Sequence, residues 1–155
     1  MARPIPLPEK ARWLILVAGL TASIPIYAVV VYFVLASAEG PPAAAPMAVR
    51  LGFYGAAFGL SLVALAVAPR VGTDPANALP FDAFLRRTVL SLAVAETSAI
   101  LGVALFFLGR NFGDFLVLAG LALAVILLGI VPRGLRWFRL REEQAPGGIP
   151  PVSPG

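Results

Sequence analysis

The stretch TVLSLAVAETSAILGVALFFL, residues 88–108, decides the fold of this chain. An α-helix needs about 20 mostly apolar residues to cross about 30 Å of hydrocarbon, and this stretch has that length. Glu96 is its single charged side chain. The apolar residues do not alternate with a period of two, which disfavours a strand. We therefore predict that residues 88–108 form a membrane-spanning helix.

The composition of the whole chain agrees with this prediction. Of the 155 residues, 59% are hydrophobic and only 13% are charged, and the mean hydropathy is +0.90. A soluble domain carries roughly 25% charged residues, and a disordered chain has low hydrophobicity. The composition excludes both classes and indicates that most side chains face lipid or one another inside a membrane.

Three further stretches are long and apolar enough to span, so the sequence predicts an all-α four-helix membrane bundle over residues 1–140. The expected spans are 13–35, 47–68, 88–108 and 112–131. Residues 141–155 are rich in Pro and Gly, and we expect them to form a disordered tail. The turn residues suggest caps: Asp82 before the third span, Gly109 after it, and Asn111 or Asp114 before the fourth.

Basic residues are distributed unequally between the two sides of the predicted bundle. Ten lie in the N-terminal segment, the second loop and the C-terminal segment, whereas only Arg50 and Arg110 lie on the other side. By the positive-inside rule both termini should be cytoplasmic. The high content of Arg, Ala, Gly and Pro suggests a GC-rich bacterial genome, so we expect a multi-pass protein of the bacterial inner (cytoplasmic) membrane.

One alternative concerns the first span. Ala36, Ser37 and Ala38 form the A-x-A pattern of a signal-peptidase site, and cleavage after Ala38 would leave three spans. The apolar stretch before it is longer than the 7–15 residues of a signal peptide, which favours an uncleaved span.

The segment after Pro132 combines basic and aromatic residues. On a helix it would be a short interfacial element that attracts anionic lipid, but the favoured interpretation is a simple stop-transfer anchor. The candidate lipid-interface residues are Arg133, Arg136, Trp137 and Arg139.

Small residues line parts of the second and third spans. Such residues permit close helix approach in membranes, where lipid provides no hydrophobic drive between helices. Packing within one bundle is the favoured interpretation, and oligomerisation is the alternative. The candidate helix-packing residues are Gly52, Gly55, Gly59, Ala95, Ala99 and Gly102.

Glu96 is the residue that most needs an explanation, because an ionised carboxylate near the bilayer centre is costly. It could be protonated, or it could gain partners from a polar layer at the same depth. Arg50 enters from the other face, too far along the membrane normal, and we expect it to snorkel outward. The candidate ion-binding or helix-packing residues are Glu96, Ser61, Ser23, Thr21, Thr97 and Ser98.

The segment AVAETSAILG, residues 93–102, resembles the carboxylate-bearing helix of rotary ATPase proteolipid (c) subunits, which reads A-x-x-E-x-x-x-I-x-G. The resemblance implies that Glu96 is an ion-binding carboxylate and that Gly102 is a packing glycine. The chain as a whole resembles small bacterial four-span membrane proteins that have a comparable third helix.

The sequence contains no His and no Cys. This removes the usual residues for disulfides, haem, iron–sulfur clusters and zinc, so we expect no metal, no cofactor and no catalytic residues. Nor is there a basic stripe for nucleic acid. We expect a structural or accessory subunit that packs in the lipid bilayer with membrane-protein partners or copies of itself. The alternative is proton or cation translocation through an oligomer that uses Glu96.

Overall fold

A computed structural model describes residues 8–37, 45–70 and 79–144. Within these ranges the regular elements are helices, and they form four rods that are each long and apolar enough to cross a membrane. This confirms the prediction of an all-α chain with four candidate spans. The helices are α1 (Glu9–Thr21), α2 (Ser23–Ser37), α3 (Met47–Val67), α4 (Phe81–Gly109), α5 (Phe112–Ala124), the π-helix η2 (Val125–Ile130) and α6 (Val131–Gln144).

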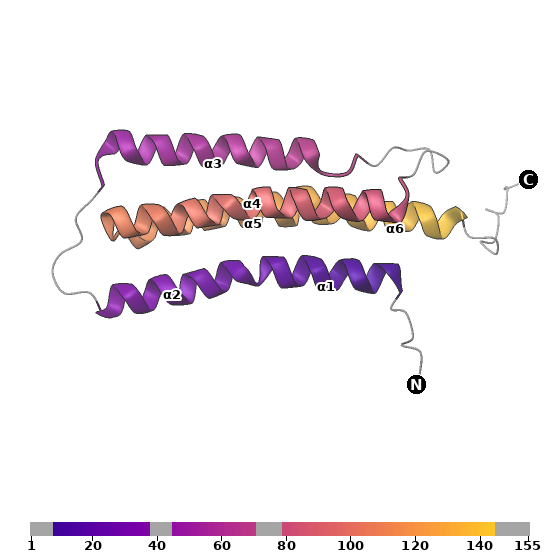
Figure 1. The fold of residues 1–155 in the computed structure, drawn as a ribbon, viewed down its shortest axis with the longest axis horizontal. Coiled ribbons are helices and arrows are strands. Elements are labelled where there is room, and N and C mark those ends of the chain that lie inside the picture. The colour runs from indigo at the N-terminus through magenta and orange to yellow at the C-terminus, as the bar shows by residue number, and fades with distance from the viewer. Residues whose placement is uncertain (1–7, 38–44, 71–78, 145–155) are drawn as a thin grey trace, which may run out of the picture.

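The four rods lie side by side, with α4 and α5 packed together in the middle (Figure 1). Helix α3 lies on one side of this central pair, and α1 and α2 lie on the other. Helix α1 begins and α6 ends at the same end of the bundle, which we call the terminal end; the other is the far end. Two exposed ion pairs join these helices at the terminal end: Lys10 with Glu142 at 3.1 Å, and Arg141 with Glu9 at 3.7 Å.

The first rod is broken in the middle by a proline. Helix α1 ends at Thr21 and α2 begins at Ser23. Pro25 has no N–H to donate, and its ring clashes with the carbonyl four residues earlier, that of Thr21. The backbone at Ala22 absorbs this conflict, so the rod consists of two helical segments rather than one.

The fourth rod is longer than the sequence predicts. We expected the span to end at residue 131, before Pro132, but the helix continues through η2 and α6 to Gln144. Pro132 interrupts the normal bonding of the preceding turn, and the wider π-helical turn directly before it accommodates that interruption. Residues 141–144 of the expected tail are therefore helical, and residues 145–155 lie outside the described residues.

The helix ends also differ in part from the predicted caps. Helix α4 begins at Phe81 with Pro80 at the N-cap position, so Asp82 lies inside the first turn and caps nothing. At its other end Gly109 is still helical, and Arg110 adopts the left-handed conformation, with φ 48°. Asn111 is the cap of α5, because its side-chain oxygen accepts a hydrogen bond from the N–H of Gly113 at 2.9 Å.

A cluster of buried and half-buried aromatic side chains joins α1, α4 and α6 at the terminal end. The rings of Phe84 and Trp137 are stacked at 4.2 Å with an angle of 9° between their planes. Trp13 packs against the same group, and Gly134 makes room for it, because a Cβ at position 134 would overlap the Trp13 ring. We call this group the aromatic cluster; its members are Trp13, Phe81, Phe84, Trp137 and Phe138.

Candidate functional site

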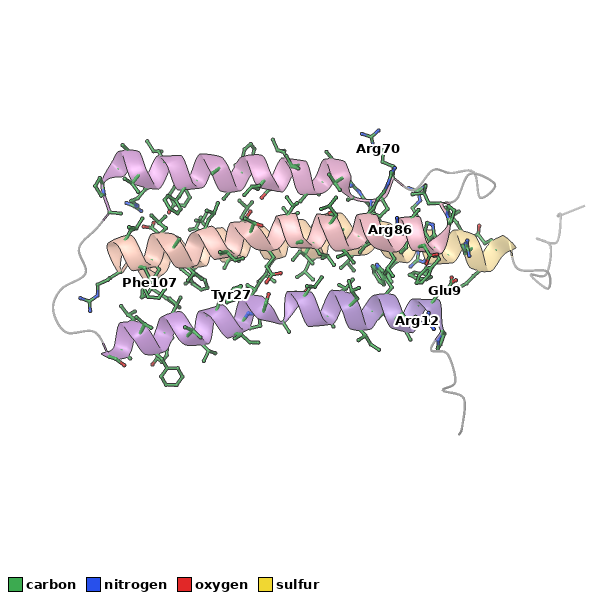
Figure 2. All side chains as sticks on the ribbon, in the orientation of Figure 1. Glu9, Arg12, Tyr27, Arg70, Arg86 and Phe107 are labelled. Atoms are coloured by element: carbon green, nitrogen blue, oxygen red, sulfur yellow. The ribbon has the colours of Figure 1, made fainter. Side chains whose placement is uncertain are left out.

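Glu96 lies near the middle of α4 and has one hydrogen-bond partner among the described side chains. The hydroxyl of Tyr27 donates to Oε1 of Glu96 at 2.8 Å. Tyr27 belongs to α2, two residues after Pro25, and extends from that helix toward α4 (Figure 2). Both side chains are half-buried. The bond links the first rod to the central pair near the middle of α4.

Of the serines that were expected to surround Glu96, Ser98 instead joins α4 to α3, and Ser61 bonds within α3. Ser98 Oγ donates to the carbonyl of Ala57 at 3.2 Å, and Ser61 donates to the same carbonyl at 2.8 Å. Ser91 Oγ donates to the carbonyl of Ala64 at 2.7 Å. All three bonds satisfy buried hydroxyls, and those of Ser98 and Ser91 connect two helices at close range, which is a packing role.

The remaining members of the expected polar layer also do not bond to Glu96. Ser23 donates to the carbonyl of Leu20 at 2.7 Å, and Thr97 donates to the carbonyl of Ala93 at 2.9 Å. Both acceptors lie on the preceding turn of the chain, a common way to satisfy a hydroxyl in an apolar helix. The hydroxyl oxygen of Thr21 is buried without a hydrogen-bond partner in the part of the chain that the structure describes.

A second polar group lies at the far end, and the sequence reasoning did not find it. Nη2 of Arg50 lies 2.6 Å from Oδ1 of Asp114, and the hydroxyl of Tyr54 donates to the same oxygen at 2.5 Å. The side chain of Asp114 is 3% exposed and that of Arg50 is 30% exposed. Arg50 therefore does not simply snorkel outward, and Asp114 is not a cap.

The position of this Arg50–Tyr54–Asp114 cluster explains why it forms. Helices α3 and α5 both begin at the far end, and Arg50 and Asp114 each lie in the first turn of their helix. Tyr54 follows Arg50 by four residues and therefore lies on the same face of α3. The signal in the sequence for this cluster was that Arg50 and Asp114 each lie in the first turn of a predicted span at the same end of the bundle. The cluster ties α3 to α5, and Oδ2 of Asp114 and Nε of Arg50 are left buried without a partner among the described residues.

The predicted small-residue faces of α4 and α3 have different surroundings. Ala95, Ala99 and Gly102 of α4 are buried. A Cβ at Gly102 would lie 3.1 Å from Cβ of Leu118 and 3.2 Å from the carbonyl oxygen of Phe115, so this glycine sets the approach of α4 to α5.

The glycines of α3 face away from the rest of the chain. A Cβ added at Gly52, Gly55 or Gly59 would meet nothing within 4 Å. Packing within one bundle was the favoured interpretation, but these three residues do not take part in packing among the described helices. The face of α3 that packs inside the chain is instead the one that carries Ala57, Ser61 and Ala64.

The expected interface residues of the last rod divide into two groups. Arg136 and Arg139 are exposed. Trp137 is not at a lipid interface, because it is buried in the aromatic cluster. Arg133 is half-buried, and its Nη1 donates to the carbonyl of Leu65 at 2.7 Å, near the end of α3. That carbonyl lies in the last turn of α3, where carbonyls accept no hydrogen bond from within the helix. The arginine therefore acts as a C-terminal cap.

The two polar groups offer hydrogen bonding and charge. Within residues 8–37, 45–70 and 79–144, no three His, Cys, Asp or Glu side chains gather closely enough to hold a metal ion. Comparison with protein-family models, with curated proteins and with solved structures finds no match in any of the three. The resemblance of residues 93–102 to proteolipid subunits stays a prediction.

Proposed function

We propose that this chain is a structural or accessory subunit of the bacterial cytoplasmic membrane and that it joins an assembly through the glycine face of α3. The observation that carries the proposal is that Gly52, Gly55 and Gly59 lie on one face of α3 and pack against nothing among the residues that the structure describes. A helix-interior glycine costs roughly 0.5–1 kcal/mol relative to alanine. Three of them on one exposed face are explained if another helix approaches the backbone there.

A shallow groove beside this face supports the same interpretation. It lies between α3 and α4, has a volume of about 360 Å³, and is lined by apolar side chains and glycine: Val49, Gly52, Phe53, Ala56 and Leu101. Ala56 continues the Gly52-x-x-x-Ala56 spacing that favours close helix approach. A helix laid against the glycine face of α3 would place its larger side chains in this groove.

The proposed orientation places the terminal end of the bundle on the cytoplasmic side. The arginines of α6 and those at the start of α4 lie at that end, whereas Arg50 and Arg110 lie at the far end. Such an asymmetry is the usual determinant of topology. Accessibility labelling of single cysteines at the two ends would test this orientation, because the native chain has no Cys.

The proposed assembly can be tested with one added cysteine. Ala56→Cys places a thiol on the glycine face, and Leu116→Cys, on an exposed position of α5, is the matched control. If the partner is a second copy, oxidation in native membranes should give a covalent dimer for the Ala56→Cys variant but not for the Leu116→Cys variant. If the partner is another protein, oxidation should give no dimer, and a thiol-directed photocrosslinker attached to Cys at position 56, but not at position 116, should give a heterologous adduct.

A second pair of variants tests the glycine face itself. Gly55→Leu should abolish the assembly that mild detergent extracts, because the added side chain blocks close approach. Gly19→Leu is the control, since Gly19 on α1 also has open space around it. Extraction of the native chain strictly as a monomer, with no covalent adduct of the Ala56→Cys variant, would refute the proposal.

Proton or cation translocation is the second candidate function, and the Glu96–Tyr27 pair favours it. The pair places an ionisable group and a hydroxyl in contact at mid-span, on the half-buried surface between α2 and α4. Glu96→Gln keeps a hydrogen-bond acceptor for Tyr27 but cannot ionise. Proton flux into reconstituted vesicles, followed with a pH-sensitive dye, should fall for Glu96→Gln and not for Thr97→Ala; equal flux in the native chain and Glu96→Gln would rule this function out.

A further inference from the structure

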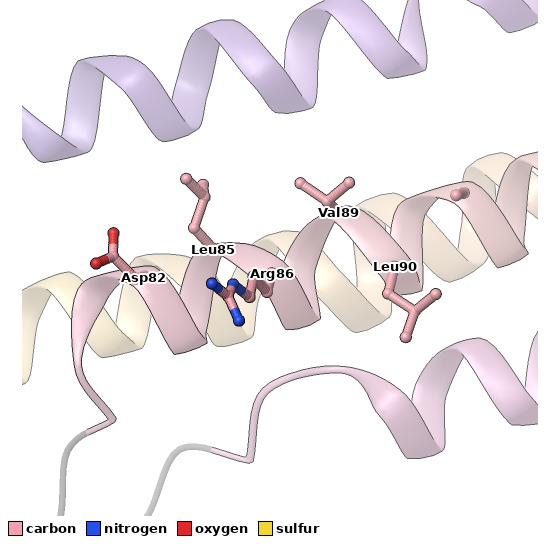
Figure 3. A pocket seen from close by; sticks show the side chains of 6 residues that line it. Asp82, Leu85, Arg86, Val89 and Leu90 are labelled. Carbon is pink, nitrogen blue, oxygen red and sulfur yellow. The ribbon is translucent and has the colours of Figure 1, made fainter.

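A groove on α4 near the terminal end has a different character from the glycine face. Its lining side chains recur every three or four residues and therefore form one continuous face of the helix. Helix α1 runs along one side of this face and α3 along the other (Figure 3). The groove has a volume of about 450 Å³ and is lined by Asp82, Leu85, Arg86, Val89, Leu90 and Ala93. We call it the α4 groove.

Two opposite charges mark the outer end of the α4 groove. Asp82 and Arg86 are both exposed. They are four residues apart, a spacing that permits a helical ion pair, yet their charged atoms are not within 4.0 Å of each other, nor do they pair with any other described residue. Among the described residues, the groove therefore presents an unpaired carboxylate and an unpaired guanidinium side by side.

The order of side chains along the groove corresponds to the order of groups in a phospholipid. Val89, Leu90 and Ala93 lie deepest and are apolar. Arg86 follows toward the start of the helix, and Asp82 lies about 6 Å beyond it at 1.5 Å per residue. Helix α4 has 29 residues and is therefore about 43 Å long, which exceeds the roughly 30 Å of hydrocarbon. Its first turns thus lie at headgroup depth.

We propose that the α4 groove binds a phospholipid with a phosphoethanolamine headgroup. The acyl chain would lie on the apolar floor between α1 and α3. The guanidinium of Arg86 would bind the phosphate, for which its planar fork of donors is suited. The primary ammonium, joined to the phosphate through a two-carbon linker, would donate to the carboxylate of Asp82.

This chemistry predicts a preference among headgroups. Phosphatidylcholine carries a quaternary ammonium without an N–H donor, so it cannot hydrogen-bond to Asp82. Phosphatidylglycerol carries no cation at all, so Asp82 would repel its net negative charge. Arg86 alone would favour the anionic lipid, and the adjacent carboxylate reverses that preference toward the zwitterionic amine.

Native mass spectrometry of the full chain in mild detergent tests the proposal. The protein is mixed with dioleoyl phosphatidylethanolamine, phosphatidylcholine or phosphatidylglycerol, and bound lipid is counted per chain. We expect phosphatidylethanolamine to bind most tightly. Asp82→Asn should weaken it roughly tenfold, as for the loss of one charge-assisted hydrogen bond, and should leave it close to phosphatidylcholine. Arg86→Gln should weaken all three.

The neighbouring arginine provides the matched control. Arg87 is exposed on the same turn of α4 but does not line the groove, so Arg87→Gln should not change binding. Leu90→Trp, which fills the floor without changing a charge, should also reduce binding. Equal binding of the three lipids by the native chain, or equal effects of Arg86→Gln and Arg87→Gln, would overturn the proposal. The site does not involve the glycine face of α3, so the two proposals can fail independently.

Discussion

Replacement of Gly102 by alanine should loosen the contact between α4 and α5. The added Cβ would lie 3.1 Å from Cβ of Leu118 and 3.2 Å from the backbone oxygen of Phe115. Carbon atoms prefer about 3.5–4.0 Å, so the two helices must separate by roughly half an ångström. A gap of 0.5–1 Å forfeits about a quarter to a half of each contact energy that it affects. Overpacking of this kind costs about 1–3 kcal/mol.

The higher helix propensity of alanine offsets part of this cost, by up to about 1 kcal/mol, and a second glycine separates the two effects. Gly120 lies on α5, is exposed, and would accept a Cβ with nothing within 4 Å. The stability of Gly102→Ala measured relative to Gly120→Ala therefore isolates the packing cost, and we expect a difference of about 1–3 kcal/mol.

The assay is reversible unfolding in mixed micelles with increasing denaturing detergent, followed by the fluorescence of Trp13 and Trp137. Gly102→Leu should lower stability further than Gly102→Ala, because Leu118 and the Phe115 backbone leave no room for a longer side chain. If Gly102→Ala and Gly120→Ala unfold at the same detergent fraction, Gly102 does not set the α4–α5 distance and the reasoning is wrong.

Two further predictions concern the Arg50–Tyr54–Asp114 cluster and the aromatic cluster. Asp114→Asn should increase hydrogen–deuterium exchange in the first turns of α3, because Arg50 and Tyr54 lose the charged acceptor that holds them. The double variant with Arg50→Gln should exchange little faster than Asp114→Asn alone. Strictly additive effects would show that Asp114 and Arg50 are not coupled. Trp137→Ala should destabilise the protein by about 3–5 kcal/mol, as for other buried large-to-small changes, and should lower Tm. Leu128→Ala should change Tm little, because Leu128 is 79% exposed. Comparable losses of stability in the two variants would contradict the buried position of Trp137.

The hydropathy of the sequence predicted the four rods because each apolar run is long. It located the apolar part of each rod but not the ends of the helices. Helix α4 begins at Phe81, seven residues before the predicted span, since backbone hydrogen bonds continue after the side chains become polar. The end of the last rod was misplaced for a related reason. Pro132 normally ends a helix, and no local pattern announces a π-helical turn that accommodates it.

The candidate site was predicted in part. The position of Glu96 near the middle of its helix was predicted from the sequence, but its partner was not, because Tyr27 was counted among the hydrophobic residues although its hydroxyl reaches the carboxylate. Arg50 and Asp114 each had a sufficient local role, as a snorkelling base and a helix cap. Their contact is tertiary and appears only once α3 and α5 are placed side by side.

The π-helical turn before Pro132 also resolves a mismatch of phase in the last rod. Phe115 and Leu118 face the bundle before the turn, and Gly134 and Trp137 face it afterwards. On an uninterrupted α-helix the second pair would be rotated from the first by nearly the angle of one residue, about 100°. A π-turn absorbs one extra residue and restores the common direction. The number of residues in this rod therefore sets how its second half is rotated relative to its first half. One further inserted residue would turn the aromatic end out of the bundle. Deletion of one residue would keep both faces aligned but would remove the wide turn that accommodates Pro132.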